Sequence, residues 1–274
     1  MPTPARPLLL AQLTDTHVVE PGAGEETWVD NTGRLREAVD SIGREVPVVA
    51  AVLVTGDLTN DGRPGEYEAL EAALAPLEVP IWPLPGNHDD VDLLRATFSD
   101  VPWAEREHAS WTTVIGGLRL VGLDSTRHGE AGAEFDDARE AWLRERLLEQ
   151  FDGPTMLAMH HPPFVTGIGW MDRAGFVGLD RLTAVLEDHR VDRIVCGHLH
   201  RPITSSVAGI PVQVGLSTVQ SVALDLGERS SPAVIRDPSG YLVHRIDGDR
   251  IVTHTRYIAT GEQPIVASWA EEMG

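Results

Sequence analysis

The 274-residue chain has no lysine, a single cysteine and no hydrophobic run long enough to cross a membrane. Its 22 basic residues are therefore all arginine, so neither a Schiff-base lysine nor a phosphate-binding P-loop lysine is available. Cys196 alone can form neither an intramolecular disulfide nor a thiolate metal cluster. Any metal held by this chain must therefore be bound by His, Asp, Glu or Asn side chains.

Positive charge is also scarce, because 42 acidic residues leave a formal net charge of −20. Such a surface repels nucleic-acid phosphates and anionic lipids, so we expect neither nucleic acid nor a membrane as a partner. An anionic substrate would need local positive charge, which a pair of divalent cations could supply. The N-terminal segment has no small-residue cleavage site of a secretory signal, so we expect a cytoplasmic protein.

Apolar strand-like segments alternate with amphipathic helical segments over most of the chain. We expect strands within 7–15, 48–57, 79–87, 154–161 and 191–198, a hairpin over 111–125, and helices within 31–45, 65–77, 90–99, 136–151 and 178–189. The pattern predicts an α/β protein with a largely parallel first part. We expect residues 1–274 to form a single domain whose β-rich, antiparallel segment 201–274 is available for cap or dimer contacts.

Polar residues recur at the carboxyl ends of the expected strands. The five clusters are Asp15 with His17, Gly56 with Asp57, Asn87 with His88, His160 with His161, and His198 with His200. One such cluster is ordinary loop chemistry. In open α/β sheets, however, the carboxyl ends of the strands form the ligand crevice, so five clusters in this position are expected to converge at one edge.

The converging side chains offer imidazole, carboxylate and amide ligands without sulfur. This ligand set suits Zn, Mn, Fe or Co. A one-metal hydrolase usually needs about three protein ligands, and this chain offers more than twice as many candidates. The surplus favours two metals, an arrangement suited to in-line displacement at phosphorus.

The motifs DTH, GD, GNHD, HHPP and GHLH, in this order between residues 15 and 200, resemble the signature of the calcineurin-like metallophosphoesterases. Within that superfamily the chain is most similar to the class III cyclic-nucleotide phosphodiesterase and glycerophosphodiesterase group. GRPGEY at 62–67, PGNHDD at 85–90, MD at 171–172 after HHPPF, and the late SPA…HR between 231 and 245 carry this similarity. The resemblance implies a four-layer αββα sandwich with a β-rich C-terminal addition.

The same resemblance implies specific roles for the clustered residues. The first metal would be held by Asp15, His17 and His200, the second by Asn87, His160 and His198, with Asp57 between them and His88 facing the substrate phosphate. His88 and Asp57 would thus be the catalytic residues, and Asn87, His88 and Phe164 would contact substrate. His161 is expected to orient its neighbour or to pack. Trp28, Trp170 and Met171 could line the pocket or belong to the core.

The resemblance implies a dinuclear metal-dependent phosphodiesterase in which a metal-bridging hydroxide attacks small diesters. The candidate substrates are 3′,5′-cyclic nucleotides such as cAMP and glycerophosphodiesters, and relatives suggest a homodimer or a higher homo-oligomer. A phosphomonoesterase on the same scaffold and a nuclease are alternatives, although the acidic composition disfavours the nuclease. A non-catalytic scaffold protein would typically lack a ligand, and none of the seven positions is missing. Asp89 either orients the His88 imidazole or caps the following helix.

Overall fold

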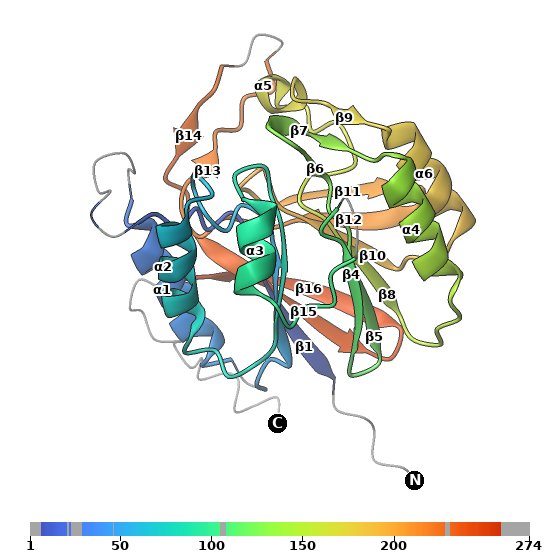
Figure 1. Cartoon of the computed structure of the whole chain (residues 1–274), viewed down its shortest axis with the longest axis horizontal. Coiled ribbons are helices and arrows are strands. Elements are labelled where there is room, and N and C mark those ends of the chain that lie inside the picture. The colour runs from blue at the N-terminus through green and yellow to red at the C-terminus, as the bar shows by residue number, and fades with distance from the viewer. Residues whose placement is uncertain are drawn as a thin grey trace, which may run out of the picture.

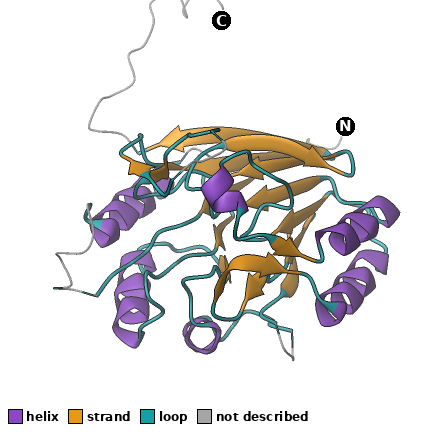
Figure 2. Cartoon of the chain, turned by 90° about the horizontal axis from the view of Figure 1, so that it is seen from above, coloured by secondary structure: helices purple, strands orange, loops and turns teal. Residues whose placement is uncertain are grey.

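The computed structural model describes residues 7–20, 22, 29–45, 47–104, 108–227 and 231–258. Two large β-sheets pack against each other, with helices on the outer face of each. Figure 1 shows helices α1 (Asn31–Ile42) and α2 (Pro64–Leu74) on one side of the molecule, and α4 (Asp137–Leu148) and α6 (Leu179–Asp188) on the other. The strands lie between these helical layers (Figure 2).

The first sheet combines strands from both ends of the described chain. In spatial order it contains β16 (Arg250–Tyr257), β15 (Gly240–Asp247), β1 (Leu8–Leu13), β2 (Ala51–Thr55) and β3 (Ile81–Leu84). β1, β2 and β3 are parallel, whereas β15 pairs antiparallel with β1 and forms a hairpin with β16. The short helix α3 (Val91–Thr97) follows β3.

The second sheet is built from the middle of the chain. Its spatial order is β11 (Ile203–Val207), β12 (Ile210–Val214), β10 (Arg193–Cys196), β8 (Thr155–Ala158), β5 (Leu118–Gly122) and β4 (Trp111–Ile115). The four central strands are parallel, and each edge strand forms an antiparallel hairpin with its neighbour. The β4–β5 turn has positive φ at Gly116 and Gly117, which only glycine adopts without strain.

Two small sheets and one short helix stand apart from the sandwich. They are β6 (Thr126–Arg127), β7 (Glu130–Glu134) and β9 (Phe176–Val177) in one sheet, β13 (Ser221–Val222) and β14 (Val234–Ile235) in the other, and α5 (Gly169–Asp172). The sequence does not predict these elements, because segments of two to five residues are too short to show hydrophobic periodicity.

Three apolar clusters separate the four layers. Along β1, Leu9 packs toward α1 and α2, while Leu10 packs between the sheets, as the pleat of a strand requires. Along β10, Ile194 faces α4 and α6, and Val195 faces the first sheet. Strands buried on both faces explain why the apolar runs in the sequence are nearly continuous. The αββα sandwich expected from the sequence is confirmed.

The expected helices and the glycine hairpin are confirmed within a few residues. The β-rich segment after residue 201 is also present. Its strands β11, β12, β15 and β16 complete the two large sheets, and β13 pairs with β14 in a small sheet. Its expected cap or dimer contacts and the single-domain assignment stay predictions, and residues 259–274 lie outside the described part of the chain. Among the described helices, none has the length and apolar character needed to cross a membrane.

Candidate metal centre

The five polar clusters converge where strands of both large sheets end. β1, β2 and β3 bring the clusters around Asp15, Asp57 and Asn87, while β8 and β10 bring those around His160 and His198. We predicted convergence at a single sheet edge, and the structure instead joins the edges of two sheets. The two sheets can share one crevice because they pack face to face with these strand ends on the same side.

The residues of the centre adopt backbone conformations that are rare outside glycine. Asp15, His17, Asp57, His198 and His200 have φ values of 52°, 42°, 51°, 70° and 52°. Among the other described non-glycine residues, Ala208 alone has a positive φ. A left-handed conformation costs an L-residue about 1–2 kcal/mol. The strained positions are thus concentrated at the ends of the ligand-bearing strands, where they turn the side chains toward one another.

One group of potential ligands contains Asp15, His17, Asp57 and His200. One ligand atom from each lies within 4.8 Å of those of the others. The Nε2 atoms of His17 and His200 are 3.1 Å apart, and His17 Nε2 lies 3.6 Å from Asp57 Oδ2. His200 donates through Nδ1 to the Gln220 carbonyl at 2.9 Å, which leaves its Nε2 lone pair for a metal.

A second group lies on the other side of Asp57. His160 Nε2 is 3.2 Å from His198 Nδ1 and 3.4 Å from Asp57 Oδ2. His160 donates through Nδ1 to the Thr55 carbonyl at 2.8 Å, so its Nε2 is available to a metal. Asn87 Oδ1 is buried without a hydrogen-bond partner among the described residues, as expected of an oxygen that binds a cation.

The protonation states in the centre follow from burial and from the close packing of acids with imidazoles. Burial lowers the pKa of His17 well below its usual value and lowers that of His198 to about 3. Burial opposes ionisation of Asp57, yet His160 and His17 outweigh it and hold its pKa well below the usual range. Burial also opposes charge on His160, but Asp57 raises its pKa to about 9. A cation bound between these two residues would replace the proton on His160.

His88 stands beside the centre and is exposed. Its backbone N–H donates to Asp57 Oδ1 at 2.9 Å, and its ring meets that of His17 edge-on with centroids 4.7 Å apart. The imidazole donates through Nδ1 to the Asn60 carbonyl at 2.7 Å. This contact fixes the ring and leaves Nε2 free. His88 and Asn87 line a cleft of about 530 Å³, where a substrate phosphate could approach.

Asp89 performs neither of the two roles considered for it. Its carboxylate accepts hydrogen bonds from the N–H groups of Leu58, Thr59 and Gly86 and from the Thr59 hydroxyl. Burial raises its pKa to about 6, with Asp57 adding to the shift. The helix cap of α3 is Asp90, whose side chain accepts from the N–H of Leu93. Asp89 therefore joins the loops that carry Asp57 and Asn87.

Two further polar residues support the centre and carried no signal in the sequence. Gln12 donates through Nε2 to Thr55 Oγ1 at 2.9 Å and to the Cys196 carbonyl at 3.0 Å, which links both sheets just before Asp57 and His198. Ser125 contacts His161 Nδ1 at 2.9 Å. All three hydrogen bonds join residues at least 36 positions apart in the sequence, so no local pattern reveals them.

Several further residues were predicted to lie near the centre, and the structure describes all but one of them. His161 lies beside His160 and His198, with a ring nitrogen within 4.8 Å of theirs, so it belongs to this group of imidazoles. Phe164 and Met171 line a cavity next to it and also pack against the second core. Trp28 lies outside the described residues.

Close packing of glycines brings the ligand loops together. A β-carbon on Gly86, just before Asn87, would lie 2.3 Å from the backbone nitrogen of Asp57. A side chain at this position would therefore push apart the loops that carry these two ligands. This contact explains why glycine precedes Asn87 in the PGN turn.

Comparison with known proteins identifies relatives over nearly the whole chain. The chain is 31% identical over 261 residues to a probable glycerophosphodiester phosphodiesterase of Arcobacter nitrofigilis, which covers 94% of this chain and 96% of that protein. It is 34% identical over 246 residues to a probable cyclic nucleotide phosphodiesterase of Rhodopseudomonas palustris, covering 88% and 89% of the two chains.

The fold has a counterpart among solved structures. The purple acid phosphatase PPD1 from yellow lupin seeds superposes with a TM-score of 0.71 at 14% identity, over 95% of this chain and 53% of the phosphatase. The sequence model of the calcineurin-like phosphoesterases matches residues 8–202, which contain all five strand-end clusters. The resemblance noted in the sequence is thereby confirmed. This protein is a member of the calcineurin-like phosphoesterase family.

Proposed function

We propose that this protein is a dinuclear metal-dependent phosphodiesterase that hydrolyses small phosphodiesters such as glycerophosphodiesters or 3′,5′-cyclic nucleotides. The observation that carries the proposal is the position of Asp57. Its Oδ2 lies 3.6 Å from His17 Nε2 and 3.4 Å from His160 Nε2, and so faces both groups of ligands. The names of the relatives support the diester substrate class.

The arrangement supports two metal positions that share Asp57. We assign Asp15, His17 and His200 to the first position, and Asn87, His160 and His198 to the second. The unpartnered Asn87 oxygen and the inward Nε2 atoms of His160 and His200 fit hard or borderline cations, and we propose Fe, Mn, Zn or Co. Bound cations there would lower the pKa of water and neutralise a phosphate.

The chain's own residues supply the remaining chemistry. Asn60 holds the His88 imidazole through Nδ1, so its Nε2 can hydrogen-bond a phosphate oxygen or give a proton to the departing alcohol. Asp57 Oδ1 holds the backbone of His88, which couples the position of this imidazole to the centre. Asp89 holds the two loops together through hydrogen bonds from the N–H groups of Leu58 and Gly86.

The surroundings of the cleft favour small substrates. Asp61, Asp90 and Asp92 lie on its walls, and the whole chain has a net charge of −20, so a polyanionic nucleic acid would be repelled. We also propose a cytoplasmic homo-oligomer. Exposed apolar side chains in the C-terminal segment, Leu224 and Leu226, support contact with a second subunit. Light scattering of the purified protein tests the oligomeric state.

A substrate panel tests the proposed activity. Chelator-treated protein is reloaded with Mn, Zn, Fe or Co and assayed with bis(p-nitrophenyl) phosphate, p-nitrophenyl phosphate, cAMP and glycerophosphocholine. We expect metal-dependent hydrolysis in which diesters exceed the monoester. His88→Ala should lower kcat about 10²–10⁴-fold, whereas His254→Ala, an exposed histidine on β16, should retain wild-type turnover. Absence of diester hydrolysis with every metal would refute the proposal.

A further inference from the structure

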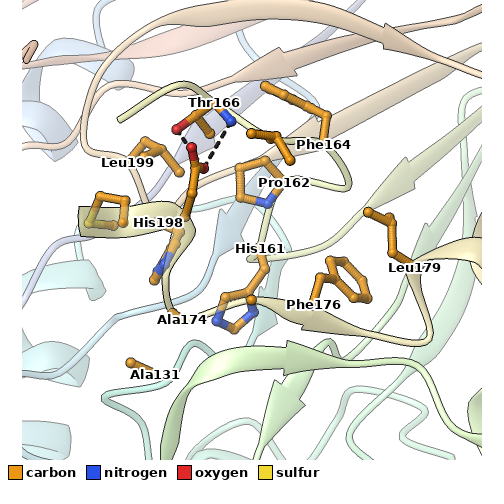
Figure 3. Close-up of a pocket in the computed structure, with 14 residues that line it drawn as sticks. Ala131, His161, Pro162, Phe164, Thr166, Ala174, Phe176, Leu179, His198 and Leu199 are labelled. Atoms are coloured by element: carbon orange, nitrogen blue, oxygen red, sulfur yellow. Dashed lines mark hydrogen bonds between the residues drawn. The ribbon is translucent and has the colours of Figure 1, made fainter. Parts of the chain in front are cut away.

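A second cavity adjoins the metal centre at His161 and His198 and shares no lining residue with the His88 cleft. Its volume is about 90 Å³. One wall is formed by His161 and His198, whose ring centroids are 4.6 Å apart (Figure 3). The lining also includes the apolar side chains of Phe164, Met171, Phe176 and Leu179. The cavity therefore shares two imidazoles with the centre but presents hydrocarbon to any occupant.

The rim of this cavity is held in place by one carboxylate. Asp172 accepts hydrogen bonds from the N–H and hydroxyl of Thr166, at 2.9 and 2.8 Å, which are the dashed lines in Figure 3. It also accepts from the N–H of Gly167 at 2.8 Å. The loop after the HHPPF motif is thus fastened to α5 near Met171. The spacing between HHPPF and MD in the sequence now has a structural reason, and the cavity is formed before any ligand enters.

The two hollows beside the centre differ in character. The cleft beside Asn87 and His88 is larger, about 530 Å³, and its lining includes both carboxylates, such as Asp61 and Asp92, and the guanidinium groups of Arg127 and Arg139. It suits a hydroxylated group, whereas the apolar cavity suits a small hydrocarbon group. A phosphodiester carries two alcohol substituents on one phosphorus, and a monoester carries one. The centre therefore offers a separate place for each substituent of a diester.

We infer that the cavity lined by Phe164, Phe176 and Leu179 is the subsite for the less polar alcohol of an acyclic phosphodiester, with the polar alcohol in the polar cleft beside His88. This inference rests on the proposed function and names its substrate class. A cavity of about 150 Å³ holds benzene, so this smaller one admits a short alkyl chain or part of one ring, but no nucleoside. Among acyclic glycerol diesters, those of small alcohols are therefore preferred over those of bulky alcohols.

Two substitutions change the cavity without touching a proposed ligand. Ala174 is exposed at its mouth, so Ala174→Phe narrows the entrance at a position that tolerates a larger side chain. Phe176→Ala widens the cavity. Val177 follows Phe176 in β9, is 50% exposed and does not line this cavity, because neighbouring strand residues point to opposite faces. Val177→Phe is therefore the matched control.

The first measurement is independent of catalysis. Binding of 4-fluorobutan-1-ol, whose short alkyl chain the cavity admits, to metal-free protein is followed by the broadening of its fluorine NMR signal. We expect binding to wild type and to Val177→Phe, and at least 10-fold weaker binding to Ala174→Phe. Equal binding to wild type and Ala174→Phe, or no binding to wild type, would overturn the inference.

The second measurement uses glycerol phosphodiesters of methyl, butyl and benzyl alcohol with Mn-loaded protein. We expect kcat/KM of wild type to rise about 10-fold from methyl to butyl, because the butyl chain buries further methylene groups. Ala174→Phe should abolish this ratio, Phe176→Ala should shift the preference toward benzyl, and Val177→Phe should keep it. If wild type hydrolyses all three esters equally, the subsite is wrong and the phosphodiesterase assignment stands. If it hydrolyses none, the activity assignment fails, and the binding of the alcohol still decides the subsite.

Discussion

A buried histidine far from the cleft links the last hairpin of the chain to the metal centre. His244 in β15 is completely buried, donates through Nε2 to Gln12 Oε1 at 2.9 Å and accepts at Nδ1 from Thr253 Oγ1 at 2.9 Å. Gln12 in turn holds the hydroxyl of Thr55 and the carbonyl of Cys196. These two residues stand two positions before Asp57 and His198. We expect this relay to make stability depend on pH.

The direction and size of this dependence follow from the His244 imidazole. Burial, with a smaller contribution from Arg193, lowers its pKa to about 3 in the folded protein. In the unfolded chain the pKa is about 6.5. Between these values the unfolded chain binds a proton that the folded chain excludes. The stability supplied by neutral His244 is therefore complete above pH 6.5 and is lost as the pH falls. From pH 7 to pH 5 this single group removes about 2 kcal/mol of unfolding free energy.

The variant His244→Gln separates titration from hydrogen bonding. Glutamine can still donate to Gln12 but does not titrate, so the variant should be about 1 kcal/mol less stable at pH 7. Its loss of stability on going to pH 5 should be about 2 kcal/mol smaller than that of wild type. Urea unfolding of metal-free protein at pH 7, 6 and 5, followed by tryptophan fluorescence, measures both differences.

A second histidine of the same hairpin provides the control. His254 in β16 is exposed, and in the register of the hairpin it faces Val243. His254→Gln should retain the pH dependence of wild type. If the stability curves of wild type and His244→Gln run parallel from pH 7 to pH 5, the buried neutral imidazole is not the source of the dependence, and the reasoning is refuted.

Three further substitutions test the centre and the packing of the two sheets. Asp57→Asn should lower the metal content from two ions to fewer than one per chain, measured by plasma emission spectroscopy, while Asp61→Asn in the neighbouring cleft should keep both. Gly197→Ala would place a β-carbon 1.9 Å from a side-chain oxygen, so metal affinity and the melting temperature should both fall, as calorimetry would show. Trp111→Phe removes the indole donor to the buried Pro83 carbonyl and should cost about 1–3 kcal/mol in urea unfolding; an unchanged midpoint would contradict the role of this bond.

The elements of the fold that are specified by a local sequence pattern could be predicted. The amphipathic pattern of 136–151 predicts α4, and the two glycines at 116–117 predict the β4–β5 turn. The pairing of β15 with β1 was not predictable, because it joins residues more than 220 positions apart and no local pattern specifies a partner strand. The same holds for the assignment of the strand ends to two sheets instead of one.

The residues of the candidate site could be predicted from the sequence, but many of the hydrogen bonds among them could not. The strand-end positions of Asp57, His160 and His198 predicted a shared metal centre, and the structure brings their ligand atoms together. Both predicted roles of Asp89, orienting His88 and capping α3, were wrong. Its carboxylate instead accepts from the N–H groups of Leu58 and Thr59, which lie 31 and 30 residues earlier, and of Gly86. Gln12 was missed because it reads as one polar residue within a buried strand.

The metal centre combines two unfavourable features, closely packed buried acids and left-handed backbone conformations, and the surrounding sheets hold it together despite them. Burial, together with the neighbouring Asp57 carboxylate, raises the pKa of Asp15, so two buried acids oppose each other's ionisation. Five ligand residues also hold left-handed backbone conformations. Both effects favour a centre in which the ligand residues move apart. The backbone hydrogen bonds of β1, β2 and β10 oppose this movement, because each of these strands is paired with a neighbour on both sides. A pair of cations would remove the electrostatic part of this conflict and leave the backbone part. The rigidity that aims the ligands therefore comes from the sheets, and the affinity for metal comes from charges that those sheets force together.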